Sequence, residues 1–196
     1  MVERSVISIG LLHFPVYNKN KEVVVTSITT SSLHDISRTA RTFGVENFYI
    51  ITPITAHKQL VDRLVKHWQA GYGAQYNPTR RDALCTVMVM NNLGECLQDL
   101  KDKYQKNPLT LATCARPRKN SISYAQLREK MQQDLQTYLI IFGTGWGIEG
   151  SLMEEMDFTI EPIYGKKEEG ERGSYNHLSV RAAVAIILDR LTNENR

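Results

Sequence analysis

The sequence has no long hydrophobic run, and no segment approaches the roughly 20 apolar residues that a membrane-spanning helix requires. Its first residues, MVERSVISIGLLHFPV, carry charges and one short apolar run that His13 and Pro15 interrupt. That pattern lacks the apolar segment and cleavage site of a signal peptide. We therefore expect a protein of the cytoplasm with no membrane partner.

Cysteine is also scarce. The chain has three, Cys85, Cys96 and Cys114, and they are widely spaced. This number and spacing favour reduced thiols in the core over a disulfide framework or a metal site, so we predict no bound metal.

The excess of charge is small, because the formal net charge is +3. That value does not indicate nucleic-acid binding by itself, so any basic surface has to arise from local clustering. Hydrophobic residues make up 42% and charged residues 23% of the chain. This composition is typical of a globular protein and excludes a disordered or collagen-like chain.

What the sequence does have is an alternation of apolar, β-branched runs with amphipathic stretches. The predicted strands are Ser5–Leu12, Glu22–Ile28, Asn47–Thr52, Cys85–Met90, Leu109–Cys114, Thr137–Phe142 and Phe158–Ile163. The predicted helices are Leu33–Phe43, Ala56–Ala70, Leu93–Tyr104, Tyr124–Leu135, Ser151–Met156 and Leu178–Leu191. The pattern predicts one α/β domain over residues 1–196, with a mostly parallel sheet and helices on both faces. A charged, glycine-containing surface loop is expected at Tyr164–Asn176.

The stretch YLIIFGTGWGIEG contains the spacing G-x-G-x-x-G at Gly145, Gly147 and Gly150. A dinucleotide fingerprint also needs an acidic residue about 20 positions later, at a strand end, with more sheet beyond it. Here the acids at that distance lie in the charged loop, and Trp146 stands where a pyrophosphate would approach the backbone. The pattern argues against NAD or FAD. It is consistent with a loop that binds a nucleoside through its backbone, or with a tight connection that binds nothing.

Three segments together resemble the SPOUT superfamily of S-adenosylmethionine-dependent RNA methyltransferases, which have the α/β-knot fold. The first is SSLHDISRTARTFGVENFYIITP, the second is IIFGTGWGIEGSLMEEMDFTIEPI, and the third is YNHLSVRAAVAIILDRL. The stretch LATCARPRK also resembles the cofactor-side strand and loop of the tRNA ribose methyltransferases in this superfamily. The resemblance is closest to a bacterial subfamily of predicted RNA methyltransferases.

The resemblance implies a deep trefoil knot within about residues 109–192 and a homodimer. It implies methyl transfer from S-adenosylmethionine to structured RNA, tRNA or rRNA, with S-adenosylhomocysteine as product. It also implies a cofactor site built from three groups of residues. These are Thr113, Cys114 and Ala115; Phe142, Gly143, Thr144, Gly145, Trp146 and Gly147; and Ile160, Pro162, Ile163, Asn176, Leu178 and Ser179. The apolar members, including Phe142 and Ile160, suit either an adenine pocket or plain core packing.

The predicted catalytic residues are Arg38 and His34. The resemblance assigns Arg38 to the target ribose or phosphate, and a guanidinium acts there first by positioning and electrostatics. A surface salt bridge is the other interpretation of Arg38. This chain departs from the ribose-methylating branch at Ser32, where that branch has Asn, and at His34, where it has Gly. The methylated atom is therefore open between a ribose 2′-oxygen and a base nitrogen. The departures also leave a non-catalytic RNA- or nucleoside-binding module as an alternative.

RNA contacts are predicted from basic clusters that would converge on one cleft. The predicted RNA-binding residues are Arg38, Arg41, Arg116, Arg118 and Lys119. Arg80 and Arg81 precede a predicted strand and are interpreted as a solvated face.

Overall fold

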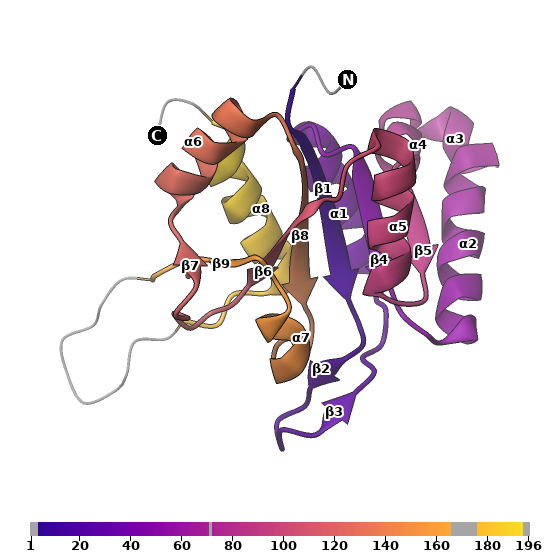
Figure 1. Cartoon of the computed structure of the whole chain (residues 1–196). Coiled ribbons are helices and arrows are strands. Elements are labelled where there is room, and N and C mark those ends of the chain that lie inside the picture. Colours follow the sequence, from indigo (N-terminus) through magenta and orange to yellow (C-terminus); the bar gives the residue numbers. More distant parts are fainter. Residues whose placement is uncertain (1–3, 71, 166–175, 194–196) are drawn as a thin grey trace.

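The computed structural model describes residues 4–70, 72–165 and 176–193. Seven parallel strands form one sheet in the order β5-β4-β1-β8-β6-β9-β7, and a separate hairpin pairs β2 with β3 (Figure 1). The strands are β1 (Val6–Leu12), β2 (Val16–Tyr17), β3 (Val23–Val24), β4 (Asn47–Ile51), β5 (Val87–Met90), β6 (Leu109–Thr113), β7 (Ser121–Ile122), β8 (Thr137–Gly143) and β9 (Phe158–Ile160). The parallel α/β sheet predicted from the sequence is confirmed.

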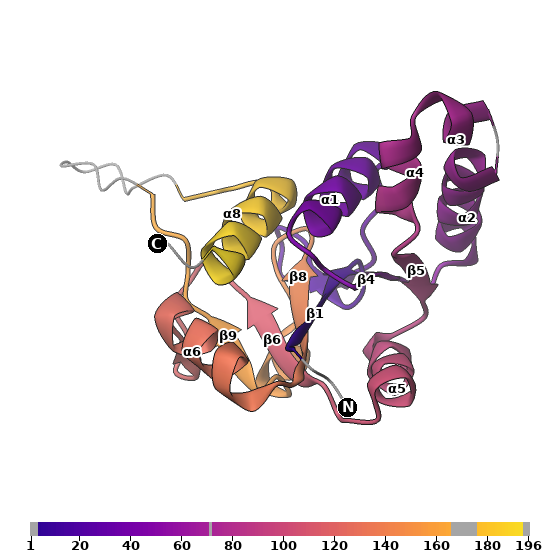
Figure 2. The ribbon, with the colours of Figure 1, turned by 90° about the horizontal axis from the view of Figure 1, so that it is seen from above.

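Helices cover both faces of the sheet, as expected (Figure 2). The helices are α1 (Thr30–Thr42), α2 (Thr55–Ala70), α3 (Tyr72–Tyr76), α4 (Pro78–Leu84), α5 (Leu93–Tyr104), α6 (Tyr124–Asp134), α7 (Gly150–Glu154) and α8 (Val180–Thr192). One core cluster joins the sheet to α1, α2, α4, α6 and α8, and a second joins it to α5 and α7.

The central strand β8 illustrates why the strands are apolar almost throughout. Tyr138, Ile140 and Phe142 pack into the first cluster, whereas Leu139 and Ile141 pack into the second. Successive side chains of a strand point to opposite faces, and here each face meets a layer of helices. Burial on both sides requires an apolar residue at every position.

The prediction of a strand at Glu22–Ile28 is wrong for most of its length. Only Val23 and Val24 are in a strand, and they pair with Tyr17 and Val16 outside the main sheet. Beyond them the backbone of Thr26 donates to the carbonyl oxygen of His13. This β-branched segment therefore folds against the end of β1 instead of entering the sheet.

The sequence analysis also missed α3, α4 and the short strands β2 and β7. Arg80 and Arg81 lie within α4 and do not lead directly into a strand. The signal for α4 was available in Asn77 followed by Pro78, since Asn77 caps the helix and Pro78 occupies its first turn. Of the three thiols, Cys96 is buried, Cys114 is half-buried and Cys85 is exposed, so the expectation of core thiols fails at Cys85.

Candidate functional site

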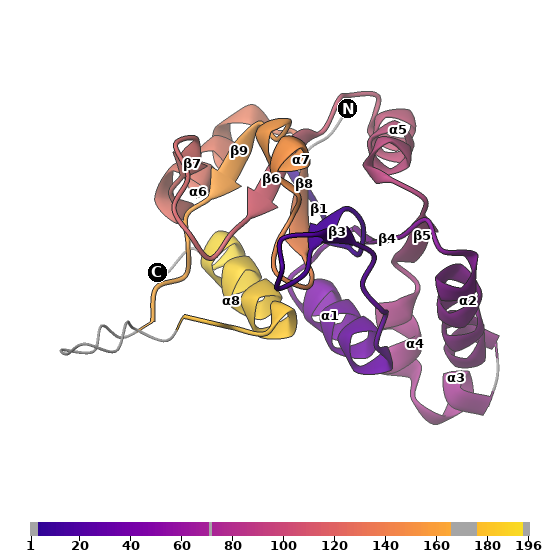
Figure 3. The ribbon, with the colours of Figure 1, turned by 90° about the horizontal axis from the view of Figure 1, so that it is seen from below.

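The three chain segments predicted to bind cofactor leave the sheet at neighbouring strand ends. Strands β8, β6 and β9 lie side by side, and Thr113 at the end of β6 is in register with Ile160 at the end of β9. Because all three strands are parallel, the loops that follow them emerge at one carboxyl edge (Figure 3). Parallel α/β sheets usually build their ligand sites at this edge.

The glycine loop after β8 is held by the β2–β3 hairpin. The amide of Trp146 donates to the carbonyl oxygen of Tyr17 at 2.8 Å. In return, the amide of Tyr17 donates to the carbonyl oxygen of Gly147 at 2.9 Å. Gly145 has φ +59°, and a Cβ built there would lie 2.7 Å from the Tyr17 carbonyl oxygen. At Gly147, which has φ +112°, a Cβ would meet no atom within 4 Å. Glycine is thus required at Gly145 by the hairpin, whereas Gly147 exposes its backbone to open space.

Glu149 fixes the end of this loop. Its carboxylate accepts hydrogen bonds from the Ser151 and Leu152 amides, both at 3.1 Å, and from the Ser151 hydroxyl. The phenol of Tyr17 also donates to it at 3.2 Å. These hydrogen bonds, led by that of the Ser151 side chain, lower the pKa of Glu149 to about 2. The carboxylate is therefore ionised at neutral pH and anchors the loop to the hairpin.

A partly buried chain of hydrogen bonds runs from the end of β1 to the glycine loop. Thr144 donates its hydroxyl proton to the Leu12 carbonyl oxygen at 2.8 Å, so it accepts from the hydroxyl of Thr26. Thr26 in turn accepts from Nδ1 of His13 at 3.0 Å. This order places the ring proton of His13 on Nδ1 and leaves Nε2 as a bare acceptor. Within the described part of the chain, that buried Nε2 has no hydrogen-bond partner.

The environment of His13 keeps its ring neutral. The residue is 2% exposed, and burial is the main cause that lowers its pKa to about 4. The nearby His57 lowers the pKa further, and a hydrogen bond at Thr26 opposes the shift. Sequence analysis missed His13, Tyr17 and Thr26 as site residues. The available signal was that His13 directly follows a strand at the edge where ligands bind.

The segment after β9 is anchored to the neighbouring elements. The amide of Glu161 donates to the Ile122 carbonyl oxygen at 3.0 Å, and its carboxylate accepts from the Tyr124 amide at 2.8 Å. Pro162, which follows, is buried. These contacts hold the segment that directly follows β9 against β7 and the start of α6.

The predicted cofactor residues differ widely in exposure. Phe142 and Ile160 are each 1% exposed and lie in the first core cluster, which fits both roles that the sequence left open. Trp146 is 67% and Leu178 47% exposed, so both present apolar surface to solvent. Ser179 caps α8 by accepting from the Ala182 amide at 3.2 Å, and this capping accounts for the residue without a ligand.

The predicted catalytic residues lie on α1. Arg38 is exposed, and among the described residues its guanidinium makes no hydrogen bond or ion pair. The helix is tied to α8 by an ion pair of 2.6 Å between Asp35 and Arg181. In the described part of the chain, Arg38 therefore has no acidic partner for the surface salt bridge that was its other interpretation.

His34 packs against Trp68 of the neighbouring helix α2, in the same helical layer as α1, and not against the cofactor loops. Its ring lies 5.7 Å from that of Trp68, and the Arg80 guanidinium lies 4.4 Å from the same indole ring. Burial, followed by the charge of Arg80, lowers the pKa of His34, while Asp35 acts in the opposite direction. No hydrogen bond in the described ranges connects Arg38 or His34 to the three cofactor loops of the same chain.

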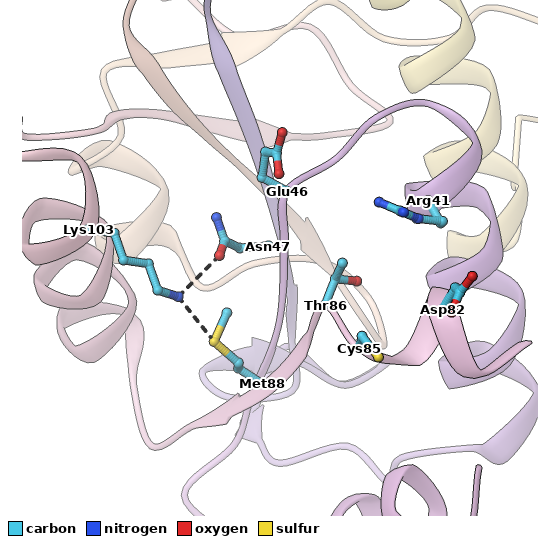
Figure 4. A pocket seen from close by; sticks show the side chains of 8 residues that line it. All are labelled: Arg41, Glu46, Asn47, Asp82, Cys85, Thr86, Met88 and Lys103. Atoms are coloured by element: carbon cyan, nitrogen blue, oxygen red, sulfur yellow. Dashed lines mark hydrogen bonds between the residues drawn. The ribbon is translucent and has the colours of Figure 1, made fainter. Parts of the chain in front are cut away.

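The basic residues predicted to bind RNA are divided between two edges. Arg116, Arg118 and Lys119 are exposed in the loop after β6, at the carboxyl edge. Arg41, in contrast, lines a cavity of about 300 Å³ at the amino ends of β4 and β5 (Figure 4). Within one chain Arg41 therefore does not meet the basic loop.

That cavity is polar and of mixed charge. Lys103 crosses it, donating to Asn47 Oδ1 at 3.1 Å and to the Met88 sulfur at 3.3 Å (Figure 4). Glu46 and Asp82 also line it, but they pair with Arg4 and Arg81 outside the lining, and Lys103 pairs with Asp99. Its position at the amino edge separates it from the strand ends that carry the predicted cofactor loops.

Residues 6–193 match the model of a family described as SAM-dependent RNA methyltransferases. The chain belongs to this family. Membership confirms the resemblance found in the sequence, and S-adenosylmethionine is the methyl donor of these enzymes, which act on RNA.

Two relatives of this RNA methyltransferase illustrate the extent of the similarity. An uncharacterised protein of Aquifex aeolicus is 42% identical over 188 residues, which cover 96% of this chain and 89% of the relative. A tRNA (guanine-N(1)-)-methyltransferase of Oleidesulfovibrio alaskensis is 35% identical over 185 residues, covering 94% of this chain. The chain spans 41% of the length of that relative.

Solved structures share the fold at low sequence identity. A putative methylase family protein of Neisseria gonorrhoeae has a TM-score of 0.62 at 14% identity, covering 96% of this chain and 82% of that one. The A. aeolicus TrmH/SpoU tRNA modifying enzyme has a TM-score of 0.54 at 17% identity, covering 97% and 74%. In the part of this methyltransferase that the structure describes, no helix is long and apolar enough to cross a membrane.

Proposed function

We propose that this chain methylates a nucleotide of structured RNA, with S-adenosylmethionine held at the carboxyl edge of β8, β6 and β9. The observation that carries the proposal is the meeting of three loops there, in a chain that belongs to this methyltransferase family. We take residues 1–196 as one catalytic domain that works in the cytoplasm. The trefoil knot is part of the proposal, and we place it within about residues 109–192.

The residues at this edge suit a nucleoside. Gly147 presents backbone with open space where a side chain would stand, so a ligand can approach its peptide groups closely. Apolar surface for an adenine ring is available from Ile163, Leu178 and Trp146. The hairpin contacts at Tyr17 hold the loop in shape before the ligand arrives, which reduces the cost of binding.

Bound there, S-adenosylmethionine supplies an electrophilic methyl group attached to a positively charged sulfur. The chain then has to hold the acceptor oxygen or nitrogen in line with the sulfur–carbon bond. Held by the loops after β8, β6 and β9, the cofactor would supply a methyl group that passes from its sulfur to the acceptor atom, and the proton of the acceptor would go to solvent or a nearby base. We assign the orientation of the acceptor, through its ribose or phosphate, to Arg38.

We propose that Arg38 acts on the cofactor held by a second copy of the chain. Among the described residues, no hydrogen bond or ion pair joins Arg38 to the cofactor loops of its own chain, which supports a site shared between protomers. On α8, Val184, Ile187 and Leu188 point to the core, so Ala182 and Ile186 lie on the outward side. An outward apolar stripe next to α1 suits a homodimer interface.

Among RNAs, tRNA is our first choice of substrate, because the O. alaskensis relative is named for tRNA. The methylated atom in the name of that relative, guanine N1, is weaker support for the acceptor atom of this chain. The match covers 41% of that relative, so the named activity is that of a much longer protein. We therefore keep both a base nitrogen and a ribose 2′-oxygen as candidate acceptors.

Two measurements test this function in order. Calorimetric titration with S-adenosylmethionine should give saturable binding, and no heat at millimolar ligand would contradict the cofactor site. Incubation with methyl-labelled cofactor and unmodified tRNA or rRNA should then transfer label, whereas binding without transfer would support the non-catalytic alternative. Nucleoside mass spectrometry of the labelled RNA identifies the methylated atom.

A further inference from the structure

The helices between β4 and β5 form a block, residues 55–84, that stands at the outer end of the sheet (Figure 2). We propose that this helical block is a docking surface for the RNA substrate, on which Tyr72 and Tyr76 stack against unpaired bases. The proposal rests on the function above and adds a second contact to it, remote from the methyl donor.

The first observation is an exposed pair of aromatic rings. Tyr72 and Tyr76 are 76% and 74% exposed, and their rings stack with centroids 5.9 Å apart at an interplanar angle of 24°. Four residues apart on α3, they share one helical face. Both phenol rings present a flat apolar side to solvent, and bases of every type stack on such surfaces.

The second observation is that α3 is built to hold these rings outward. A Cβ at Gly73 would lie 2.7 Å from a ring carbon of Trp68, so only glycine lets α3 approach α2 this closely. Ala74, the other small residue of α3, is buried as well. With Gly73 and Ala74 facing inward, the tyrosines on either side face away from the core.

The third observation concerns charge. The helical block contains five Lys and Arg residues against two Asp residues, an excess of three positive charges. The remainder of the chain has 19 basic and 19 acidic residues, so the block accounts for the whole net charge of +3. The basic residues of the block are Lys58, Arg63, Lys66, Arg80 and Arg81. Aromatic platforms flanked by cations are typical of surfaces that bind single-stranded nucleic acid.

Arg80 differs from the other basic residues of the block because its side chain packs inside the block. Its guanidinium lies over the Trp68 ring and joins α4 to α2, so it supports the block from within. Arg63 and Lys66 on α2 are exposed and available to phosphates. The helical block thus combines an internal support, a stacking pair and free cations.

The position of α3 suits a large substrate. In two views it lies at the corner of the molecule away from α7 and the glycine loop before it (Figures 1 and 3). A folded RNA exposes unpaired bases in loops away from the nucleotide that is modified. Docking at α3 therefore adds affinity without contact with the methyl donor.

The test compares RNA affinity by fluorescence anisotropy with labelled, unmodified tRNA. We expect Tyr72→Ala/Tyr76→Ala to weaken binding at least about tenfold, because each lost stacking contact is of that order. The matched control Tyr72→Phe/Tyr76→Phe keeps the rings and should bind within about twofold of the wild type. Affinity for S-adenosylmethionine should be the same in all three proteins.

A second pair of variants tests the charges. Arg63→Ala/Lys66→Ala should reduce the salt dependence of RNA binding, lowering the log–log slope by roughly one to two. Lys101→Ala/Lys106→Ala removes two exposed cations elsewhere and should leave the slope unchanged. Ultraviolet crosslinking of 4-thiouridine-labelled tRNA should attach RNA at Tyr72 or Tyr76.

The outcomes separate this proposal from the function on which it rests. If the wild-type protein binds and methylates RNA while Tyr72→Ala/Tyr76→Ala binds RNA equally well, the docking surface is refuted and the function stands. The docking surface is also refuted if the substitutions remove the RNA crosslink at Tyr72 or Tyr76 but leave the RNA affinity unchanged. If the wild-type protein binds S-adenosylmethionine but no RNA, the function fails with it.

Discussion

The Nδ1 atom of His13 lies 3.0 Å from the hydroxyl of Thr26, which joins the end of the central strand β1 to the segment that enters α1. Through Thr144 the same chain of hydrogen bonds reaches the glycine loop. The proposed cofactor loop is thus fixed to the N-terminal part of the fold by a chain of hydrogen bonds that ends at the buried, neutral imidazole of His13.

This arrangement predicts a pH-dependent stability. The pKa of His13 falls from 6.5 in the unfolded chain to about 4 in the folded one. Between these values the unfolded state binds more protons, so the free energy of unfolding decreases as pH falls from 6.5 toward 4. The contribution of His13 is on the order of 3 kcal/mol.

Urea denaturation of the wild type and of His13→Gln at several pH values tests this prediction. The free energy of unfolding should depend less steeply on pH in the variant. The lowered pKa of His34 is common to both proteins and cancels in the comparison. Parallel curves would contradict the assignment.

Gly145→Ala should impair cofactor binding. The substitution adds a Cβ at 2.7 Å from the Tyr17 carbonyl oxygen, so the hairpin or the loop has to move. We expect at least tenfold weaker S-adenosylmethionine binding by calorimetry. The control Gly44→Ala also has a positive φ, of +70°, but open space around the new Cβ. It should cost about 1–2 kcal/mol of stability and leave the cofactor affinity intact. Equal cofactor affinity in both variants would contradict a role for the loop shape.

Arg38→Ala should lower methyl transfer without altering cofactor affinity. A guanidinium that orients the acceptor and stabilises charge at the reacting atoms contributes about 100-fold or more to the rate. Single-turnover transfer to tRNA measures the rate, and calorimetry measures cofactor binding. Arg38→Lys should recover only part of the loss, since an ammonium group cannot make the paired contacts of a guanidinium. Full transfer by Arg38→Ala would remove the residue from the proposed mechanism.

Mixing two inactive variants tests whether the site is shared. If Arg38 acts across a dimer, Arg38→Ala and Gly145→Ala chains should form mixed dimers with one intact site. After exchange at equal concentrations, activity should return to about one quarter of the wild-type value, because random pairing gives half mixed dimers with half the sites. Activity that stays at the level of the separate variants would place Arg38 and the glycine loop in one protomer. Analytical ultracentrifugation of the mixture confirms that dimers are present.

The long periodic elements were predictable from sequence because one physical pattern determined each of them. The apolar run in β8 follows from burial on both faces of the sheet. The apolar face of α2 follows from the packing of Val61, Leu64 and Trp68 on the core. The helices α3 and α4, of five and seven residues, and the two-residue strands β2 and β7 were missed because such short segments show little periodicity. The segment Glu22–Ile28 was misassigned because its β-branched composition fits a strand, whereas its partners lie at the end of β1.

For the site, the glycine loop and its neighbours could be located from the residues that carry the family resemblance, and the loops do meet at adjacent strand ends. His13, Tyr17 and Thr26 could not be identified in this way. The hydrogen-bond partners of Tyr17 and Thr26, which are Glu149 and Thr144, lie more than 100 positions away in the chain, and local sequence does not indicate such distant contacts.

The sequence by itself determined the alternation of strands and helices, the need for glycine at a sharp turn, and the membership in an RNA methyltransferase family. These properties depend on local periodicity, local backbone freedom and shared motifs. Only the tertiary structure decided which strands are neighbours, that His34 packs against Trp68, and that Arg41 and the basic loop lie at opposite edges. Those relationships arise from the crossover connections of a parallel sheet, which bring distant segments together for the burial of apolar surface.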